Sequence, residues 1–111
     1  MGLKIEDKRA LSNVEESLKV PGIAFAEWGP GDMALSQGVP FAAAEGPEAP
    51  EVMRKARARV LAACKANKIF FLNSVRPDTV VREIQDGVMI GSGGPEAAEI
   101  GRKHTKRSMP W

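Results

Sequence analysis

The chain has 111 residues, of which 43% are hydrophobic and 27% charged, and a formal net charge of +2, a composition typical of one small soluble domain. No apolar run approaches the roughly 20 residues of a membrane-spanning helix, and the N-terminus lacks the apolar core of a signal peptide. With a single cysteine, Cys64, the chain cannot form an internal disulfide, which favours a cytoplasmic location. Cys64 itself is expected to be a core residue.

The charge is unevenly distributed along the chain. Residues 102–111 contain four Lys or Arg residues and no acid, which leaves the rest of the chain with a net charge of −2. We interpret 102–111 as a basic C-terminal tail, because positive charge is common at solvated ends and at helix C-termini. Nucleic-acid binding is not favoured, since no long basic stripe accompanies the few aromatic residues. His104, within this tail, is expected to be exposed rather than catalytic.

Short apolar segments alternate with helical patterns in the first half of the chain. Residues 2–6 predict a strand, residues 7–19 a helix, and residues 23–28 a second strand. A glycine-rich loop then leads to a helical turn over 32–37, and 39–50 is rich in Pro, Gly and Ala, as loops are. The helix over 7–19 is predicted from apolar residues on one face: Ala10, Leu11, Val14 and Leu18.

The second half continues this alternation. Residues 51–66 predict a long helix, 68–75 a buried strand, 78–85 a helix, 87–94 a strand with a glycine-rich end, and 95–104 a last helix. The apolar stripe of the long helix consists of Val52, Met53, Ala56, Val60, Ala63 and Cys64.

The order β-α-β-α-α-β-α-β-α predicts an α/β fold with parallel strands joined by crossovers. Asp78 is expected to be the N-cap of its helix, and Pro95 to stand at the first position of the last helix. Two architectures satisfy this order. One is an open four-stranded sheet, and the other is part of a larger closed barrel.

Two acids stand at the ends of the first two predicted strands. Glu6 ends the first strand, and Asp32 follows the second. Neighbouring parallel strands lie about 4.8 Å apart, so both carboxylates can converge on one Mg²⁺ or Mn²⁺ ion. The alternative is structural: Asp32 caps a helix that follows a Gly-Pro turn, and Glu6 is a surface acid.

The loop between these acids suggests an anion site beside the metal. Gly29 and Gly31 allow the backbone to approach a ligand, and the amides of Gly31 and Asp32 lie at a helix start, which favours a carboxylate or phosphate. A metal beside such amides can hold a 2-oxo acid and stabilise the enolate of aldol cleavage. Trp28, just before the turn, is a candidate wall of the pocket or a core residue.

Residues 5–38, IEDKRALSNVEESLKVPGIAFAEWGPGDMALSQG, resemble the HpcH/HpaI aldolase and citrate lyase family of metal-dependent 2-oxo-acid aldolases. In that family a metal-binding Glu ends a strand, and a second ligand, an Asp, follows the next strand 26 residues later, as Glu6 and Asp32 do here. The other matching residues are Ala10, Asn13, Glu16, Val20, Gly22, Ile23, Gly29, Pro30, Ser36 and Gly38. Met33 stands where the family usually has Leu.

The resemblance implies that residues 1–111 are the C-terminal half of a (β/α)₈ barrel, its strands five to eight. It implies aldol cleavage giving pyruvate or another 2-oxo acid and an aldehyde, with Mg²⁺ or Mn²⁺ held by Glu6 and Asp32. The family's substrate-binding Arg and its His–acid pair come from earlier strands, and neither Arg76 nor His104 matches them. A homo-oligomer or a separate N-terminal half would then complete the barrel.

Two other functions remain open at this stage. The chain is alternatively an inactive barrel fragment that assembles with itself as a structural or interaction module. It is alternatively an anion- or nucleotide-binding α/β module that uses residues 91–96, GSGGPE, although this segment lacks the Lys and the spacing of known phosphate-binding motifs.

Overall fold

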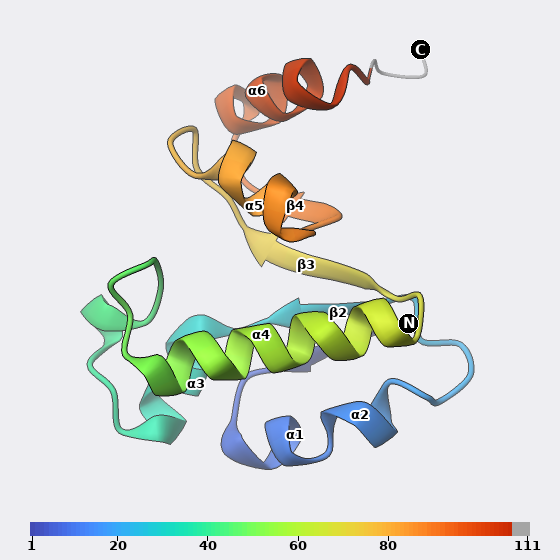
Figure 1. Ribbon diagram of the computed structural model, residues 1–111, viewed down its shortest axis with the longest axis vertical. Coiled ribbons are helices and arrows are strands. Elements are labelled where there is room, and N and C mark those ends of the chain that lie inside the picture. Colours follow the sequence, from blue (N-terminus) through green and yellow to red (C-terminus); the bar gives the residue numbers. More distant parts are fainter. Residues whose placement is uncertain (108–111) are drawn as a thin grey trace. The chain divides into compact units, whose positions relative to one another are not determined.

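The computed structural model describes residues 1–107, and the chain divides into two compact units, Met1–Phe71 and Leu72–Trp111. The predicted class is confirmed, because the structure is α/β and its strands are parallel. Figure 1 shows the elements in chain order: β1 Gly2–Ile5, α1 Lys8–Ser12, α2 Val14–Ser17, β2 Phe25–Trp28, α3 Pro30–Gln37, the 3-10 helix η1 Phe41–Ala43, α4 Glu51–Ala66, β3 Phe70–Ser74, α5 Val80–Asp86, β4 Ile90–Ser92 and α6 Pro95–Thr105. None of the helices described is long and apolar enough to cross a membrane.

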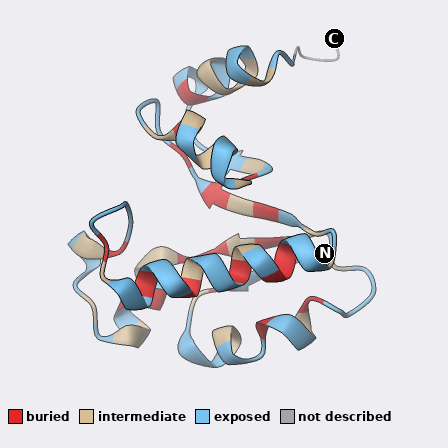
Figure 2. Cartoon of the chain, in the orientation of Figure 1, coloured by how far each residue is buried: buried red, intermediate tan, exposed pale blue. Residues whose placement is uncertain are grey.

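The first unit packs its helices onto one face of the β1–β2 pair. Helix α4 runs along β2 (Figure 1), and its inward residues are buried, as Figure 2 shows in red. The core of this unit comprises Ile5, Val14, Leu18, Ala26, Trp28, Met33, Ala34, Ala44, Ala49, Met53, Ala56, Val60, Ala63, Cys64 and Phe71. The predicted α4 stripe is therefore confirmed except at Val52, which is 42% exposed because it lies at the edge of the stripe.

The helix predicted over residues 7–19 is interrupted. It forms as α1 and α2, which are separated at Asn13. The Asn13 side-chain amide donates a hydrogen bond to the Arg9 carbonyl (2.9 Å), and such local side-chain bonds compete with a continuous helix. Asp7 caps α1, because its Oδ1 accepts a hydrogen bond from the Ala10 amide (2.7 Å).

The second unit pairs β3 with β4 and packs α5 against α6. Val75, Val80 and Ala97 form its buried cluster, with Val81, Ile84 and Ile100 beside them. The prediction that Asp78 caps α5 is wrong: Thr79 is the N-cap, and Asp78 forms an ion pair with Arg76 (3.2 Å). Pro95 does stand at the start of α6, as predicted.

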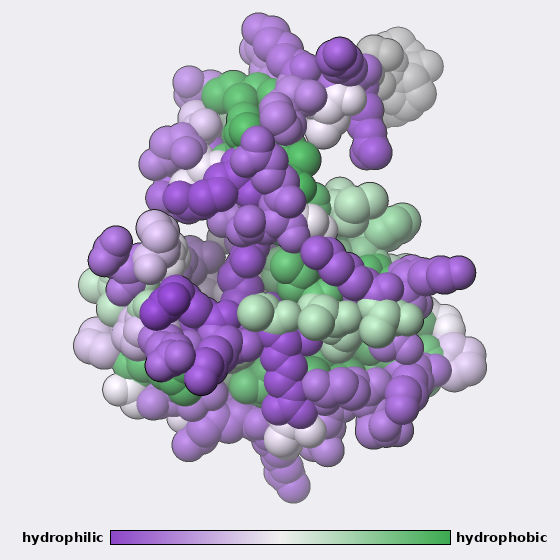
Figure 3. Space-filling view, in the orientation of Figure 1, coloured by the Kyte–Doolittle hydropathy of each residue, from purple (hydrophilic) through white to green (hydrophobic). Residues whose placement is uncertain are grey.

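Residues 91–96 include glycines that the packing requires. A Cβ at Gly93 would lie 2.6 Å from the Val75 carbonyl oxygen, so only glycine fits against this strand without a shift. Packing against Val75 therefore explains why residue 93 is a glycine. The face of the molecule seen in Figure 3 is mainly hydrophilic, with hydrophobic groups exposed between hydrophilic ones.

An ion pair joins α2 to α4 and provides a pH-dependent test of the first unit. The Arg59 guanidinium donates hydrogen bonds to both carboxylate oxygens of Glu15 (2.6 and 2.8 Å), and this pairing lowers the pKa of Glu15 to about 2. The folded pKa is below the ordinary value of 4.5, so the stabilisation is complete above pH 4.5 and is lost as the pH falls towards 2. Both side chains are nearly half exposed, so we expect Glu15→Gln to cost less than about 1 kcal/mol at pH 7.

Urea unfolding at several pH values measures this effect. The free energies of unfolding of wild type and Glu15→Gln should converge between pH 4.5 and 2. Glu51→Gln, which removes an exposed acid from the i,i+4 pair with Lys55, is the matched control. A constant difference between wild type and Glu15→Gln down to pH 2 would contradict the prediction.

Candidate metal centre

Polar side chains share one face of the β1–β2 pair. The strands are parallel, with Lys4 opposite Glu27 and Ile5 opposite Trp28. Because side chains alternate along a strand, Lys4 and Glu27 lie on one face, and Ile5 and Trp28 on the other. Glu6 continues β1 on the face of Lys4. The chain thus separates a charged row from an apolar row that faces the core.

Gly29 makes room for Glu6. The Gly29 amide donates a hydrogen bond to the Ile5 carbonyl (3.1 Å), which brings Gly29 beside Glu6. A Cβ at position 29 would lie 2.6 Å from the Glu6 Cβ and 3.2 Å from its Oε2. The sequence suggested that this glycine admits a ligand; in the structure it admits the Glu6 side chain.

Helix α3 begins directly after this contact and holds Asp32 in its first turn. Pro30 occupies the first helical position, where its missing N–H costs nothing. The Met33 amide donates to the Gly29 carbonyl (3.0 Å), so the amides of Gly31 and Asp32 precede the first intrahelical bond. Such amides and the helix dipole favour an anion at this end of α3.

Phe41 packs on the same turn. A Cβ at Gly31 would lie 2.7 Å from Cε2 of the Phe41 ring, so a glycine at 31 allows this ring to lie against the backbone. Phe41 is 80% exposed even so. The start of α3 therefore has an aromatic side chain of η1 beside its amides.

Ser36 joins the two loops that bear the acids. Its hydroxyl accepts a hydrogen bond from the Lys8 amide (3.0 Å). Lys8 begins α1 just after Glu6, and Ser36 lies one turn after Asp32 on α3. This bond links the loop after β1 to the helix that presents Asp32.

Lys4 lies among the acids of this face. Its ammonium is 2.9 Å from Oε2 of Glu6, an oxygen that is buried and accepts no well-directed hydrogen bond. The contact with Glu6 raises the pKa of Lys4, and the charges of Glu27 and Asp32 act in the same direction. One ammonium is thus within electrostatic reach of three carboxylates.

The acids of this face suit a hard divalent cation. Glu6 offers a carboxylate whose Oε2 is buried and paired with the exposed Lys4 ammonium, and Asp32 offers a second carboxylate. In the described part of the chain, no group of three or more His, Cys, Asp or Glu residues is arranged to hold a metal. A pair of carboxylates, with water or substrate oxygens in the remaining positions, is the ligand set that Mg²⁺ commonly uses.

The structure brings Glu6, Gly31 and Asp32 into one region, together with Lys4 and Glu27. Trp28 is 3% exposed and packs in the core behind the charged face. The sequence analysis gave no role to Lys4, although Lys4 and Glu27 each stand two residues before a residue singled out there, Glu6 or Gly29. This equal spacing could have indicated that Lys4 and Glu27 lie opposite each other, but only if the register of β1 against β2 had been known.

The other candidates of the sequence are located elsewhere. His104 is exposed in the last turn of α6, which also contains the half-buried Arg102. Residues 108–111 of the basic tail lie outside the described residues. Arg76 is exposed and pairs with Asp78. Cys64 is buried, which raises the pKa of its thiol to about 11. This agrees with its predicted core position.

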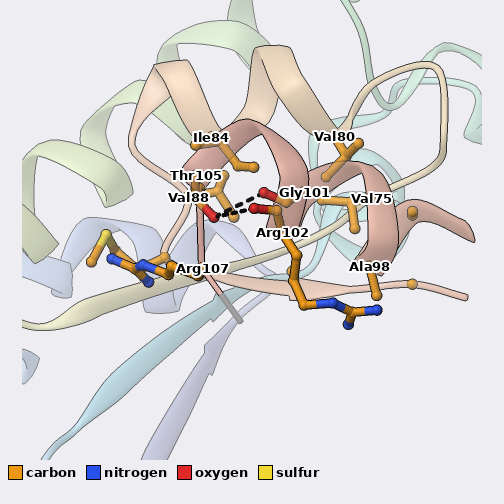
Figure 4. Close-up of a pocket in the computed structure, with 13 residues that line it drawn as sticks. Val75, Val80, Ile84, Val88, Ala98, Gly101, Arg102, Thr105 and Arg107 are labelled. Carbon is orange, nitrogen blue, oxygen red and sulfur yellow. Dashed lines mark hydrogen bonds between the residues drawn. The ribbon is translucent and has the colours of Figure 1, made fainter. Parts of the chain in front are cut away.

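A separate cavity lies within the second unit. It has a volume of about 310 Å³ and lies between α5, β4 and α6 (Figure 4). Its lining includes apolar residues such as Val75, Val80 and Ile84, with Arg102 and Arg107 and with Gly91 and Gly93 of the segment 91–96. None of the residues predicted for the metal site lines it. The Thr105 hydroxyl beside it donates to the Gly101 carbonyl (2.9 Å). The cavity therefore offers no carboxylate for a metal.

Solved structures with the same fold are citrate lyases and related proteins. The chain matches the citrate lyase beta subunit complexed with oxaloacetate and magnesium from M. tuberculosis at a TM-score of 0.76 and 16% identity, covering 94% of this chain and 51% of that chain. A citrate lyase from Burkholderia xenovorans LB400 gives 0.80 and 20%, covering 96% and 38%. The protein CitE from M. tuberculosis, in complex with magnesium, acetoacetate and coenzyme A, gives 0.75 and 17%, covering 95% and 43%.

These similarities define the fold and its extent. The chain spans 38% to 51% of the length of these solved structures, and its βα units correspond to half of a (β/α)₈ barrel. No curated protein matches the chain. The model of the HpcH/HpaI aldolase/citrate lyase family matches residues 1–99. The chain therefore belongs to the HpcH/HpaI aldolase/citrate lyase family.

Proposed function

We propose that this chain provides the metal-binding half of a lyase that reversibly cleaves an aldol to pyruvate or a related 2-oxo acid and an aldehyde. The main support is the placing of Glu6, whose Oε2 is buried and paired with the Lys4 ammonium, in the same charged region as Asp32. Membership of an aldolase/citrate lyase family supports the reaction class. A related structure contains magnesium together with oxaloacetate, which is itself a 2-oxo acid.

In this proposal, Glu6 and Asp32 hold Mg²⁺ or Mn²⁺. The cation, when bound, supplies a Lewis acid for the keto oxygen of the substrate. The amides of Gly31 and Asp32 bind the substrate carboxylate, because they precede the first intrahelical bond of α3 and lie at its positive end. Phe41, whose ring lies against Gly31, borders the space that this carboxylate would enter.

Completion of the site requires groups that the described chain does not present beside Glu6. By resemblance, the substrate-binding Arg and the His–acid pair come from the other half of the barrel. We therefore propose a complementary N-terminal half or a second copy of this chain as the partner. Exposed hydrophobic side chains are compatible with such assembly: Leu35, Phe41, Val52, Phe70 and Met89. A cytoplasmic location is also proposed, since the one thiol, of Cys64, is free and buried.

Calorimetric titration of the 111-residue chain with Mn²⁺, with and without oxalate, tests this function. Oxalate is a planar dianion with the shape of a deprotonated 2-oxo acid, and it can engage a cation and the α3 amides together. We expect oxalate to tighten Mn²⁺ binding about tenfold or more, because the bound cation and the bound oxalate each increase the affinity of the site for the other. Acetate at equal ionic strength is the control and should have little effect. Mn²⁺ binding that oxalate does not change would contradict a 2-oxo-acid site.

A further inference from the structure

We propose that Lys4 is a positioning residue that occupies Oε2 of Glu6 when no cation is bound and moves to Glu27 when a cation binds through that oxygen. The proposal rests on the proposed function, since it concerns the same metal site. It assigns to Lys4 and Glu27 a joint control of metal affinity. Neither residue is a metal ligand in this arrangement.

The first support is the position of the Lys4 ammonium. It lies 2.9 Å from Oε2 of Glu6, the oxygen that is buried and without a directed hydrogen bond. A divalent cation that Glu6 binds through Oε2 would compete with the ammonium for that oxygen. A cation and an ammonium cannot share it closely, because like charges at such distances repel. Metal binding through Oε2 therefore displaces Lys4 from Glu6.

The second support is an available alternative partner. Glu27 is the Cα partner of Lys4 across the parallel β1–β2 pair, and both side chains lie on the same face. The Glu27 carboxylate already acts on the Lys4 ammonium electrostatically. Lys4 is exposed and has a long, flexible side chain, so it can turn from Glu6 to Glu27 without any movement of the backbone.

The consequence is a competition that sets the affinity for the metal. In the metal-free chain Lys4 neutralises Glu6 and limits the repulsion between the acids of this face. When the metal binds, Glu27 accepts the displaced ammonium. Removal of Lys4 should tighten metal binding, whereas removal of the Glu27 charge should weaken it. A lysine with a merely structural role would give the opposite sign for the first change, because its loss would loosen the site.

Calorimetric Mn²⁺ titration of four forms of the 111-residue chain tests this: wild type, Lys4→Met, Glu27→Gln and the double variant. We expect Lys4→Met to lower the Kd about fivefold and Glu27→Gln to raise it about threefold, the size of effects at exposed ion pairs. In the Lys4→Met background, Glu27→Gln should change the Kd by clearly less than in wild type, because the two effects are coupled.

Lys8→Met is the matched control, since it removes an exposed positive charge near the same loop without a contact to Glu6. Equal tightening by Lys8→Met and Lys4→Met would overturn the proposal in favour of long-range charge. An unchanged or weaker affinity in a folded Lys4→Met variant, or additive effects in the double variant, would also overturn it. If Lys4→Met does not fold, Lys4→Gln takes its place with the same expected direction.

The same data separate failure of this inference from failure of the proposed function. Mn²⁺ binding by wild type with no response to Lys4→Met overturns only the role of Lys4. Absence of Mn²⁺ binding in both wild type and Lys4→Met overturns the metal site as well. The variant has no ammonium that competes for Glu6, so competition cannot explain why it fails to bind.

Discussion

Replacing Asp32 with asparagine is expected to weaken Mn²⁺ binding at least about a hundredfold, which is the upper end of the loss seen when only an outer-shell partner of a metal is removed. Asparagine preserves the size of the side chain and one oxygen, but it removes the charge that a hard cation prefers. The fold should tolerate the change. Asp32 is exposed in the first turn of α3, where its interaction with the helix dipole contributes about 0.3–1 kcal/mol.

Calorimetry of the 111-residue chain measures this effect, and circular dichroism verifies the fold. Glu48→Gln is the matched control, because it removes an exposed acid of the same unit that lies in the loop before α4. Glu6→Gln should reproduce the loss seen with Asp32→Asn, since both carboxylates are required. Wild-type affinity in either variant would show that the corresponding acid is not a ligand.

The sequence was sufficient for the elements whose signals are local. Helix α4 was predicted over 51–66 and observed at Glu51–Ala66, because its apolar residues recur with the helical period and Pro50 precedes it. Asn13 shows the limit of such reasoning. The apolar face over 7–19 is real, yet one side-chain bond to the Arg9 carbonyl divides the segment into α1 and α2. A periodicity does not reveal that competition.

The candidate site was predictable only in part. The spacing between Glu6 and Asp32 matched a family pattern, and the strand ends explain why both acids lie in one region. The roles of Lys4 and Glu27 depend on the register of β1 against β2. A shift of one residue would place the two side chains on opposite faces, and the sequence of each strand alone does not fix that choice. The contact of Gly29 with the Glu6 side chain could not be predicted either, because it depends on the same register.

Met33 connects the packing of the first unit to the site, because it directly follows Asp32 on α3 and is 0% exposed. Replacing Met33 with alanine is expected to lower the free energy of unfolding by about 2–5 kcal/mol, the usual cost of a cavity at a buried methionine. Such a loss is a large fraction of the roughly 5–15 kcal/mol that stabilises a typical domain. The Mn²⁺ affinity should fall too, since α3 would repack and shift Asp32.

Met33→Leu distinguishes volume from identity at this position. Leucine, which the family resemblance makes the usual residue here, conserves most of the volume, so we expect a cost below about 1.5 kcal/mol and nearly unchanged Mn²⁺ affinity. Met89→Ala is the exposed control: Met89 is 54% exposed, and its loss should change stability by no more than about 0.5 kcal/mol. Urea unfolding of the three variants measures the differences. A Met33→Ala variant as stable as Met89→Ala would mean that α3 is not anchored through its buried face, and that Asp32 owes its position to the Ser36–Lys8 hydrogen bond and the Gly29 turn instead.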